Sequence, residues 1–323
     1  MNPSSSDVLR AARQAKHALF LKSRDVKARR QALSARASFA RTGVMRTIRE
    51  SVTLPRHIPS GPEIWGIAMV KNEVDIIEDV LRHNIDQGLD AVLILDNGSS
   101  DGTRELLGKL SGELPIYVGD DPIVAYEQSA KMTFLADTAA QHRAEWIVPF
   151  DADEFWFGVG GSLNETLKAS TCRVERAWIY NVFPQSDGLE WQFDPTRHFD
   201  PKVAFRPQRG AVLHVGNHSV SRTGAIGDQL RILHKPWRSK EQFFQKIRQG
   251  AKALEESGLP EDKGYHWRHV GAKDDSAQNG IWEDLLSGKV TPDIAWYPRG
   301  TVRPFPKTVP PRWDDVLSQE EGE

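Results

Sequence analysis

Two aspartates at the centre of the chain, Asp151 and Asp153, are the residues whose type and spacing most clearly allow chemistry. They follow the apolar run 146–150, which is typical of a strand buried on both faces. Side chains two residues apart in an extended chain project from the same face, so the two carboxylates repel each other unless a cation lies between them. Oxygen ligands of this kind suit Mg²⁺ or Mn²⁺. An Asp-x-Asp pair arises readily by chance, so its place at a strand end is what predicts a metal site.

The elements around this pair predict how it is positioned. Apolar runs over 64–70 and 91–95 are expected to be two more buried strands, with amphipathic helices between them. Strands that alternate with helices predict a parallel, doubly wound sheet, in which ligands bind at the carboxyl ends of the strands. A polar tract follows each of the three strands, at 71–73, 96–101 and 151–154. The sequence therefore predicts an α/β fold in which these tracts line one crevice.

Composition sets the broad class of protein. The chain of 323 residues is long enough for one large α/β domain or two smaller ones. Its single cysteine, Cys172, excludes an internal disulfide and fits a reducing compartment, and we interpret it as a structural residue. No apolar stretch approaches the roughly 20 residues of a membrane span, and the amino terminus lacks the apolar core of a secretory signal. We expect a cytoplasmic protein.

Charge is distributed unevenly along the chain. Residues 1–56 hold 13 Lys and Arg against three acidic residues, whereas the remainder holds 29 basic and 41 acidic residues. We expect a basic, helical or partly disordered extension over residues 1–60, without a packed core of its own. A basic helix of this kind suits peripheral contact with an anionic membrane on its inner face, through residues 1–56. Nucleic acid is a rival partner, which we do not expect here, and a solvated extension is the plain alternative.

Five short motifs then follow one another over residues 64 to about 285. They occupy 70–73, 96–103, 150–155, 201–207 and 234–246. In this order they resemble the motifs of family 2-like glycosyltransferases with the GT-A fold, most closely the subset whose Asp-x-Asp motif continues as Asp-Glu-Phe. The resemblance implies a Rossmann-like, mostly parallel, doubly wound sheet with a mixed half on the acceptor side.

The resemblance also implies where an activated sugar binds. In similar enzymes the ends of the first two strands hold the nucleotide, here UDP or GDP, because a carboxylate accepts hydrogen bonds from ribose hydroxyls or a base N–H. Helix capping is the alternative role for Glu73 and Asp96, and a plain surface position is the alternative for the two residues of the 126–142 helix. The implied nucleotide-sugar set is Asn72, Glu73, Asp96, Asn97, Gln128, Lys131 and Asp151, with Lys235 and Arg238 on the phosphates.

The metal shell implied by the resemblance consists of Asp151, Asp153 and His234. The metal neutralises the charge that develops on the leaving nucleoside diphosphate. An imidazole beside carboxylates favours Mn²⁺ over Mg²⁺. A buried, hydrogen-bonded histidine is the alternative for His234, and Glu154 is expected either to orient a ligand or to face a neighbouring helix.

An inverting transferase also needs a carboxylate base near the acceptor hydroxyl. Three candidates lie in the second half of the chain, Asp187, Glu190 and Asp228, and we favour Asp187. Whether the anomeric configuration is inverted or retained stays open.

Alternating apolar stretches over 172–233 predict a partly antiparallel second half that forms the acceptor side. His214 and His218 are four residues apart, a metal-binding spacing on a helix, but Gly216 and the β-branched neighbours argue against a helix, so we expect structural or acceptor contacts. Five prolines after 292 predict an extended tail. The expected domains are thus 1–60, the transferase domain 61–290 and the tail 291–323.

The predicted function is the metal-dependent transfer of a sugar from a nucleotide-sugar to a hydroxyl of a glycan or lipid-linked acceptor, in polysaccharide or glycoconjugate synthesis. A nucleotidyltransferase is the first alternative, but it wants a Gly-rich, basic phosphate loop after the first strand, which residues 70–73 do not provide. The second alternative is a non-catalytic glycan-binding or scaffold protein on a transferase fold, and loss of the aspartate pair would indicate it.

Overall fold

The computed structural model describes residues 5–185, 190–257 and 264–318. Its core is a sheet whose first half is parallel, with strands β1 (Ile64–Val70), β2 (Ala91–Asp96), β3 (Ile116–Asp120) and β4 (Trp146–Pro149). They lie in the order β3-β2-β1-β4, with Trp65 level with both Ala91 and Ile147. Every residue of β2 and β4 is buried, which explains their continuous apolar sequences.

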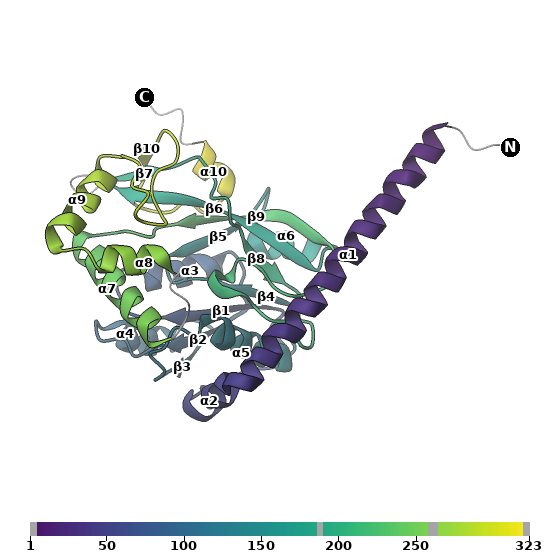
Figure 1. Ribbon diagram of the computed structural model, residues 1–323, viewed down its shortest axis with the longest axis horizontal. Coiled ribbons are helices and arrows are strands. Elements are labelled where there is room, and N and C mark those ends of the chain that lie inside the picture. The colour runs from purple at the N-terminus through teal and green to yellow at the C-terminus, as the bar shows by residue number, and fades with distance from the viewer. Residues whose placement is uncertain (1–4, 186–189, 258–263, 319–323) are drawn as a thin grey trace.

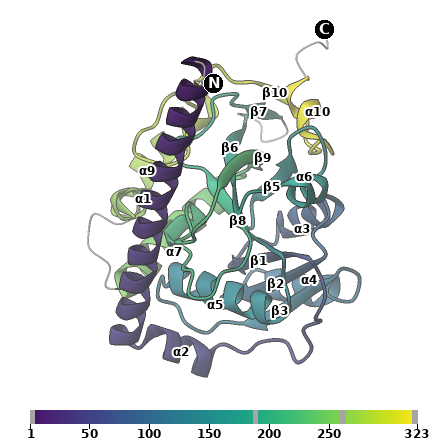
Figure 2. The ribbon, with the colours of Figure 1, turned by 90° about the vertical axis from the view of Figure 1, so that its right-hand side faces the viewer.

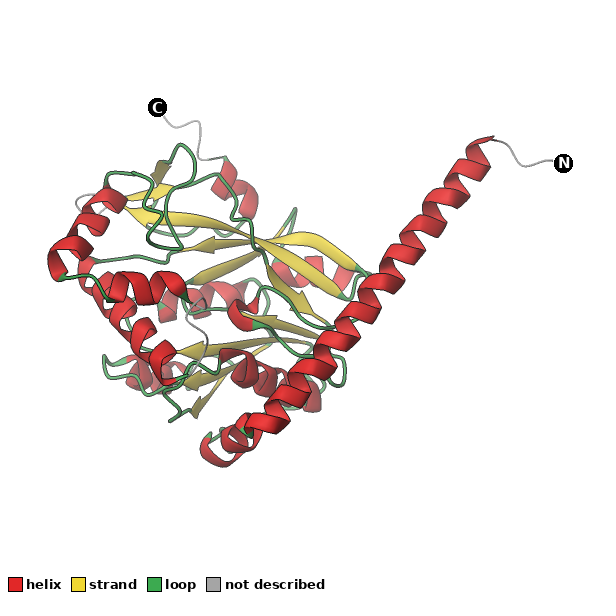
Figure 3. Ribbon diagram, in the orientation of Figure 1, coloured by secondary structure: helices red, strands yellow, loops and turns green. Residues whose placement is uncertain are grey.

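Helices cover both faces of this parallel half (Figure 3). One face is covered by α3 (Ile77–Asp86), α4 (Thr103–Leu110) and α6 (Leu163–Ala169). These helices pack against the side chains that β1, β2 and β4 direct to that face. On the other face lie α2 (Val44–Ser51) and α5 (Gln128–Gln141). Both faces of the sheet are therefore buried, as a doubly wound α/β fold requires.

The second half of the sheet is mixed. Its longest strand, β6 (Val174–Pro184), pairs antiparallel with β7 (Trp191–Phe193) and β8 (Lys202–Phe205), and parallel with β9 (Ile226–His234). β9 also pairs antiparallel with β5 (Glu154–Gly158), and β8 joins this half to β4. The predicted fold class, a parallel α/β half followed by a mixed half, is confirmed.

Three helices, α7 (Lys240–Glu256), α8 (Tyr265–Gly271) and α9 (Asp275–Leu286), form a separate apolar cluster. The Ser239 hydroxyl accepts a hydrogen bond from the Gln242 N–H and so caps α7. Phe243 and Ile247 of α7 are fully buried, as the amphipathic pattern of this segment predicts.

The amino-terminal helix α1 (Ser5–Thr42) extends past the sheets, away from the body of the molecule (Figures 1 and 2). It is tied to the body by Arg36, which pairs with Asp137 at 3.0 Å, and by Asp25, which accepts a hydrogen bond from the Gly224 N–H. The expectation that this segment packs into no core is wrong beyond α1, because Met45 and Ile48 of α2 are buried against α5. Among the described residues, no helix has the length and apolarity needed to cross a bilayer.

The prediction of an extended tail after residue 290 is also wrong for the residues up to 318. This segment forms β10 (Arg303–Phe305), which pairs with β7, and α10 (Trp313–Leu317). Phe305, Trp313 and Val316 are buried in the core. The prolines break regular structure, but the aromatic side chains between them supply enough apolar surface to hold the segment against the sheet.

Candidate functional site

A cavity of about 260 Å³ lies at the carboxyl ends of β1 and β4 and is closed on one side by α7. This is where an open α/β sheet binds its ligands. The polar side chains at its wall come from all three predicted strand-end tracts and from α5, β9 and α7. They are Lys71, Glu73, Asn97, Gln128, Lys131, Asp151, Asp153, His234, Lys246 and Gln249.

The acidic motif forms the turn between β4 and β5. The Asp151 N–H donates to the Glu154 carboxylate at 3.0 Å, which fixes the turn. The Asp153 carbonyl accepts from the Lys235 N–H at 3.0 Å, so the end of β9 holds the same turn from the other side. β5 and β9 pair antiparallel, and the turn that leads into β5 thus presents Asp151 and Asp153 to the cavity.

Asp151 is paired with a buried lysine of β8. The Lys202 ammonium lies 2.5 Å from Asp151 and 2.9 Å from Glu154, and Asn217 donates to Asp151 at 3.3 Å. Burial by itself would lower the pKa of Lys202, but the two carboxylates raise it above its ordinary value. Lys202 therefore stays charged, and the expected repulsion between Asp151 and its neighbours is relieved by a cation of the chain itself.

Asp153 is surrounded by cationic side chains. Its Oδ2 lies 2.5 Å from the Lys246 ammonium and 3.8 Å from Arg238 Nη1, and its Oδ1 lies 3.4 Å from His234 Nε2. Burial would raise the pKa of Asp153, but Lys246 and His234 hold it well below its usual range. The neighbours of Asp153 thus favour its ionised form.

Behind this pair, Glu73 and Arg238 form a buried support. Arg238 contacts the Glu73 carboxylate closely and binds both oxygens of Asp75, at 2.6 and 2.9 Å. Burial raises the pKa of Glu73. Glu73 lines the cavity. Arg238 does not line the cavity and lies behind Glu73, so its position does not support the predicted contact with phosphate.

Only two of the three predicted metal ligands, Asp153 and His234, lie next to each other. Asp153 Oδ1 and His234 Nε2 face one position, and His234 Nδ1 lies 2.9 Å from Asn181 Oδ1, the kind of outer contact that orients a ligating imidazole. Asp151 does not join them, because it is taken up by Lys202. No group of three metal-binding side chains forms within residues 5–185, 190–257 and 264–318. Asp153 and His234 are thus placed to hold a cation, but the complete predicted set of three ligands is not assembled.

A second polar group lies on the β2–β3 side of the cavity. Lys131 of α5 pairs with Asp121 at 2.6 Å, and both side chains are buried. Lys131 also donates to the Ile123 carbonyl, and Asn97 donates to Asp121 at 2.8 Å and to the same Ile123 carbonyl. Asn97, Lys131 and Gln128 thus lie at one cavity, as predicted.

Asn72 and Asp96 are not at the cavity wall. Asn72 has a φ of 55°, in the left-handed region that asparagine tolerates, and its side chain accepts from the Ser100 N–H at 2.8 Å. Asp96 accepts from the Ser99 N–H at 3.1 Å. Both residues shape the loop after β2, and Asp96 does not cap α4 (Thr103–Leu110), which has no side-chain cap.

Of the three predicted bases, the two that the structure describes, Glu190 and Asp228, do not line the cavity. Asp187 lies outside the described residues. Glu190 immediately precedes β7, and Asp228 is exposed near the start of β9, six residues or roughly 20 Å from His234 at the other end. Asp228 is therefore too far along β9 to reach the acidic turn.

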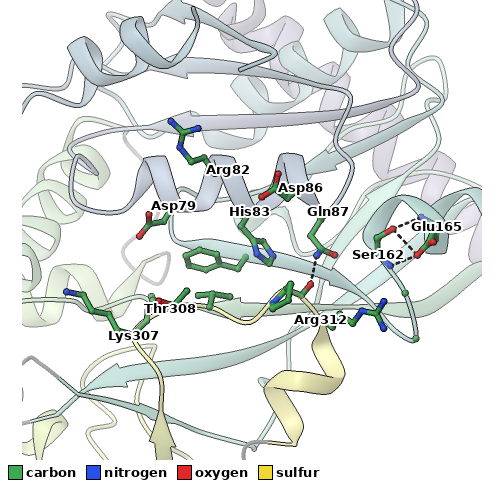
Figure 4. A pocket seen from close by; sticks show the side chains of 16 residues that line it. Asp79, Arg82, His83, Asp86, Gln87, Ser162, Glu165, Lys307, Thr308 and Arg312 are labelled. Atoms are coloured by element: carbon green, nitrogen blue, oxygen red, sulfur yellow. Dashed lines mark hydrogen bonds between the residues drawn. The ribbon is translucent and has the colours of Figure 1, made fainter. Parts of the chain in front are cut away.

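A larger cavity, of about 710 Å³, lies on the α3 side of the molecule (Figure 4). His83 and Gln87 of α3 face Thr308 and Arg312 of the carboxyl-terminal segment across it, and Gln87 donates to the Pro311 carbonyl. Lys235, predicted to hold phosphate, lines this cavity and not the one at the acidic turn. The two cavities share none of their lining residues.

Three residues that the sequence did not single out carry much of the charge at the site: Asp121, Lys202 and Lys246. Lys202 belongs to the 201–207 motif and is the first residue of β8, and Lys246 lies three residues after the buried Phe243. That helical spacing was a usable signal, since residues three apart share a face. His214 and His218 flank a short 3-10 turn, η1 (Val215–Asn217), which agrees with the expectation that they do not share an α-helix.

Comparison with known proteins gave similarity only at the level of solved structures. No family model matches the chain, and no curated protein matches it. TarS from S. aureus, residues 1–349, is 16% identical, with 65% of this chain and 69% of that chain covered and a TM-score of 0.37. The same TarS fragment with UDP-GlcNAc is 14% identical, with 65% and 71% covered and a TM-score of 0.38. GalNAc-T7 with UDP, GalNAc and Mn²⁺ is 11% identical, with 70% and 57% covered and a TM-score of 0.37.

Proposed function

We propose that the protein is a glycosyltransferase that binds a nucleotide-sugar, UDP- or GDP-linked, in the cavity at the acidic turn. The observation that carries the proposal is the Asp151–Asp153 turn at the carboxyl end of β4, with Glu73 and Asn97 at the ends of β1 and β2 in the same cavity. Its motifs resemble, in order, those of family 2-like GT-A enzymes. The acceptor is a hydroxyl of a glycan or lipid-linked molecule.

The reaction is a displacement at the anomeric carbon. The bond from that carbon to the diphosphate oxygen breaks and its electron pair leaves with the diphosphate, while the acceptor oxygen forms the new bond and gives its proton to a carboxylate. Asp187 stays the proposed base. Lys246 and Arg238 lie beside Asp153, so the arriving phosphates meet cationic side chains that the chain itself supplies.

Asp153 and His234 are the residues that would hold Mn²⁺ or Mg²⁺. A bound divalent ion would supply positive charge to the leaving diphosphate. Asp151 is not part of this pair in the proposal, since Lys202 neutralises it.

The basic helix α1 supports a further part of the proposal, peripheral contact with an anionic membrane surface. It carries most of the basic residues of the first 56 and extends away from the catalytic half (Figure 1).

Nucleotide binding tests the proposal directly. Thermal unfolding is measured with UDP, GDP, CMP and dTDP, each with and without Mn²⁺, because a ligand of the native state raises the unfolding temperature. We expect one diphosphate to stabilise the protein, more so with Mn²⁺, and Asp153→Asn to remove the metal-dependent part. Asp284→Asn, an exposed carboxylate of α9, is the control. A wild-type protein that no nucleotide stabilises would contradict the proposal.

Turnover separates the remaining alternatives. A glycosyltransferase releases a nucleoside diphosphate from a sugar nucleotide, whereas a nucleotidyltransferase releases pyrophosphate from a nucleoside triphosphate. A non-catalytic glycan-binding protein releases neither. Diphosphate release that depends on an added acceptor supports the proposal, and pyrophosphate release replaces it by the nucleotidyltransferase.

A further inference from the structure

We propose that Lys246 is a catalytic residue whose ammonium leaves Asp153 to bind the diphosphate of the donor. This inference rests on the proposed glycosyltransferase function and names the cation that receives the leaving group. It assigns a role to a residue outside all the predicted ligand sets.

Lys246 is the cation of the acidic turn that faces the cavity. Its side chain is 24% exposed, compared with 3% for Asp153 and 6% for Arg238. Its ammonium lies 2.5 Å from Asp153 Oδ2 and 3.6 Å from Glu73 Oε1. A ligand that enters the cavity therefore meets Lys246 before it meets the buried side chains behind.

The helix that carries Lys246 forms an open wall. Gln249, Gly250 and Ala253, at three, four and seven residues from Lys246, line the same cavity, so one face of α7 is turned toward it. A side chain at Gly250 would meet the Trp267 ring at 2.9 Å, so glycine permits Trp267 to close over this wall. Gly250 thus makes room for Trp267, and the cavity next to the Lys246 ammonium is bounded by Gln249, Ala253 and Trp267.

Arg238 keeps a positive charge beside Asp153 and Glu73 when Lys246 moves away from them. It contacts Glu73, binds both oxygens of Asp75, donates to the Lys235 carbonyl and lies 3.8 Å from Asp153. Arg238 is therefore held in place by four groups. When Lys246 turns to the donor, Asp153 and Glu73 keep a neighbouring cation, and no carboxylate is left buried without one.

The charge balance of the reaction gives Lys246 its task. As the bond between the anomeric carbon and the diphosphate oxygen breaks, negative charge grows on that oxygen and the acceptor proton passes to the base. The leaving diphosphate carries one more negative charge than the diphosphate of the intact donor. An ammonium that contacts it therefore binds the leaving group more tightly than the donor, which lowers the barrier. Lys246 donates hydrogen bonds and gives up no proton.

The experiment compares three nucleotide states. Binding of the nucleoside, its monophosphate and its diphosphate is measured by titration calorimetry for uridine and guanosine, with and without a chelator, on the wild type, Lys246→Gln and Lys246→Arg. Lys252→Gln is the matched control, because Lys252 lies on α7 and is 71% exposed. The nucleoside affinity and the circular dichroism spectrum verify that each variant is folded.

We expect Lys246→Gln to weaken diphosphate binding by about 10- to 100-fold and to leave nucleoside binding unchanged, because a hydrogen bond from a charged donor is lost only with the phosphates. The loss persists with the chelator, and Lys246→Arg restores most of it. With a sugar donor, kcat falls together with the diphosphate affinity. Equal diphosphate affinity in Lys246→Gln and the wild type would overturn the role of Lys246 while the proposed function stands. Absence of nucleotide binding in the wild type would overturn both.

Discussion

At the scale of single residues, the site is governed by buried charges that neutralise one another. Lys202, Lys246 and Arg238 together form ion pairs with five carboxylates, which lie in the segments 73–75 and 151–154. Removing one member of a buried pair is costly because the other is left without a partner. The carboxylates that the sequence marks as ligands are thus also structural, and their substitution acts on stability and on binding.

The Lys131–Asp121 pair allows a stability test away from the acidic turn. Both side chains are buried and the charges are 2.6 Å apart, so Asp121→Asn leaves a buried ammonium. We expect a loss of about 3–5 kcal/mol in the free energy of unfolding, measured by urea denaturation. Asp121→Asn with Lys131→Met removes both charges and should recover part of the loss.

The adjacent residue provides the control for this pair. Asp120 is 55% exposed and pairs with Arg104 at the surface, so Asp120→Asn should change the unfolding free energy by less than about 1 kcal/mol. Similar losses for Asp120→Asn and Asp121→Asn would contradict the assignment of the cost to burial.

At the scale of elements, the joint between α3 and β5 sets how the β4–β5 turn is presented. Asn84 of α3 donates to the Glu154 carbonyl and accepts from the Trp156 N–H, and His83 contacts the Trp156 carbonyl at 3.0 Å. A strand that leaves the parallel sheet needs such side-chain partners for its backbone. The joint thus fixes the strand that begins at Glu154, next to the acidic turn.

His83 makes this joint sensitive to pH. Burial, opposed in part by the bond to the Trp156 carbonyl, lowers the pKa of His83 to about 4, below the usual 6.5. As pH falls below 6.5 the unfolded chain takes up a proton that the native state does not, so stability should decline between pH 6.5 and pH 4. We expect His83→Gln to remove about 1–2 kcal/mol of this decline. Chemical denaturation at pH 7 and 4.5 measures it, with the exposed His57→Gln as control; identical slopes for His83→Gln and the wild type would refute the assignment.

At the scale of the whole molecule, the first 52 residues divide into an outer helix and an inner one. α1 is held by few described contacts, whereas Ile48 of α2 is fully buried and Met45 and Val52 are nearly so. Deletion of residues 1–42 should lower the unfolding free energy by about 1–2 kcal/mol, and deletion of residues 1–52 by at least about 3 kcal/mol, since it exposes an apolar core. Equal stability of the two deletions would contradict the packing of α2.

The same deletion tests the membrane proposal. Full-length protein should sediment with phosphatidylserine vesicles and not with phosphatidylcholine vesicles, and salt should weaken the binding, because each basic residue near an anionic surface contributes about 1 kcal/mol. The variant without residues 1–42 should stay in solution with both. Equal sedimentation of the two proteins would remove α1 as the contact.

The parallel half was predictable from the sequence. Strands buried on both faces give continuous apolar runs, and the polar tract after each run fixes where a ligand would meet the sheet, as at β1, β2 and β4. The ends of the chain were less predictable. Prolines in 291–318 suggested a tail, and the buried Phe305 and Trp313 are too few and too widely spaced to show a periodic pattern.

By itself the sequence determined that polar tracts follow three buried strands and that Glu73, Asn97, Asp151 and Asp153 meet at one cavity, because these features depend on local apolar runs and on the geometry of a parallel sheet. Only the tertiary structure decided which cation stands beside each carboxylate. Lys202 and Lys246 come from elements 51 and 93 residues away from Asp151 and Asp153, and no periodicity records a pairing over that distance. Whether two charges neutralise each other depends on their distance in the folded protein and not on their separation along the chain. The acidic motif therefore predicts a metal site from the sequence, whereas in the structure lysines pair with its carboxylates.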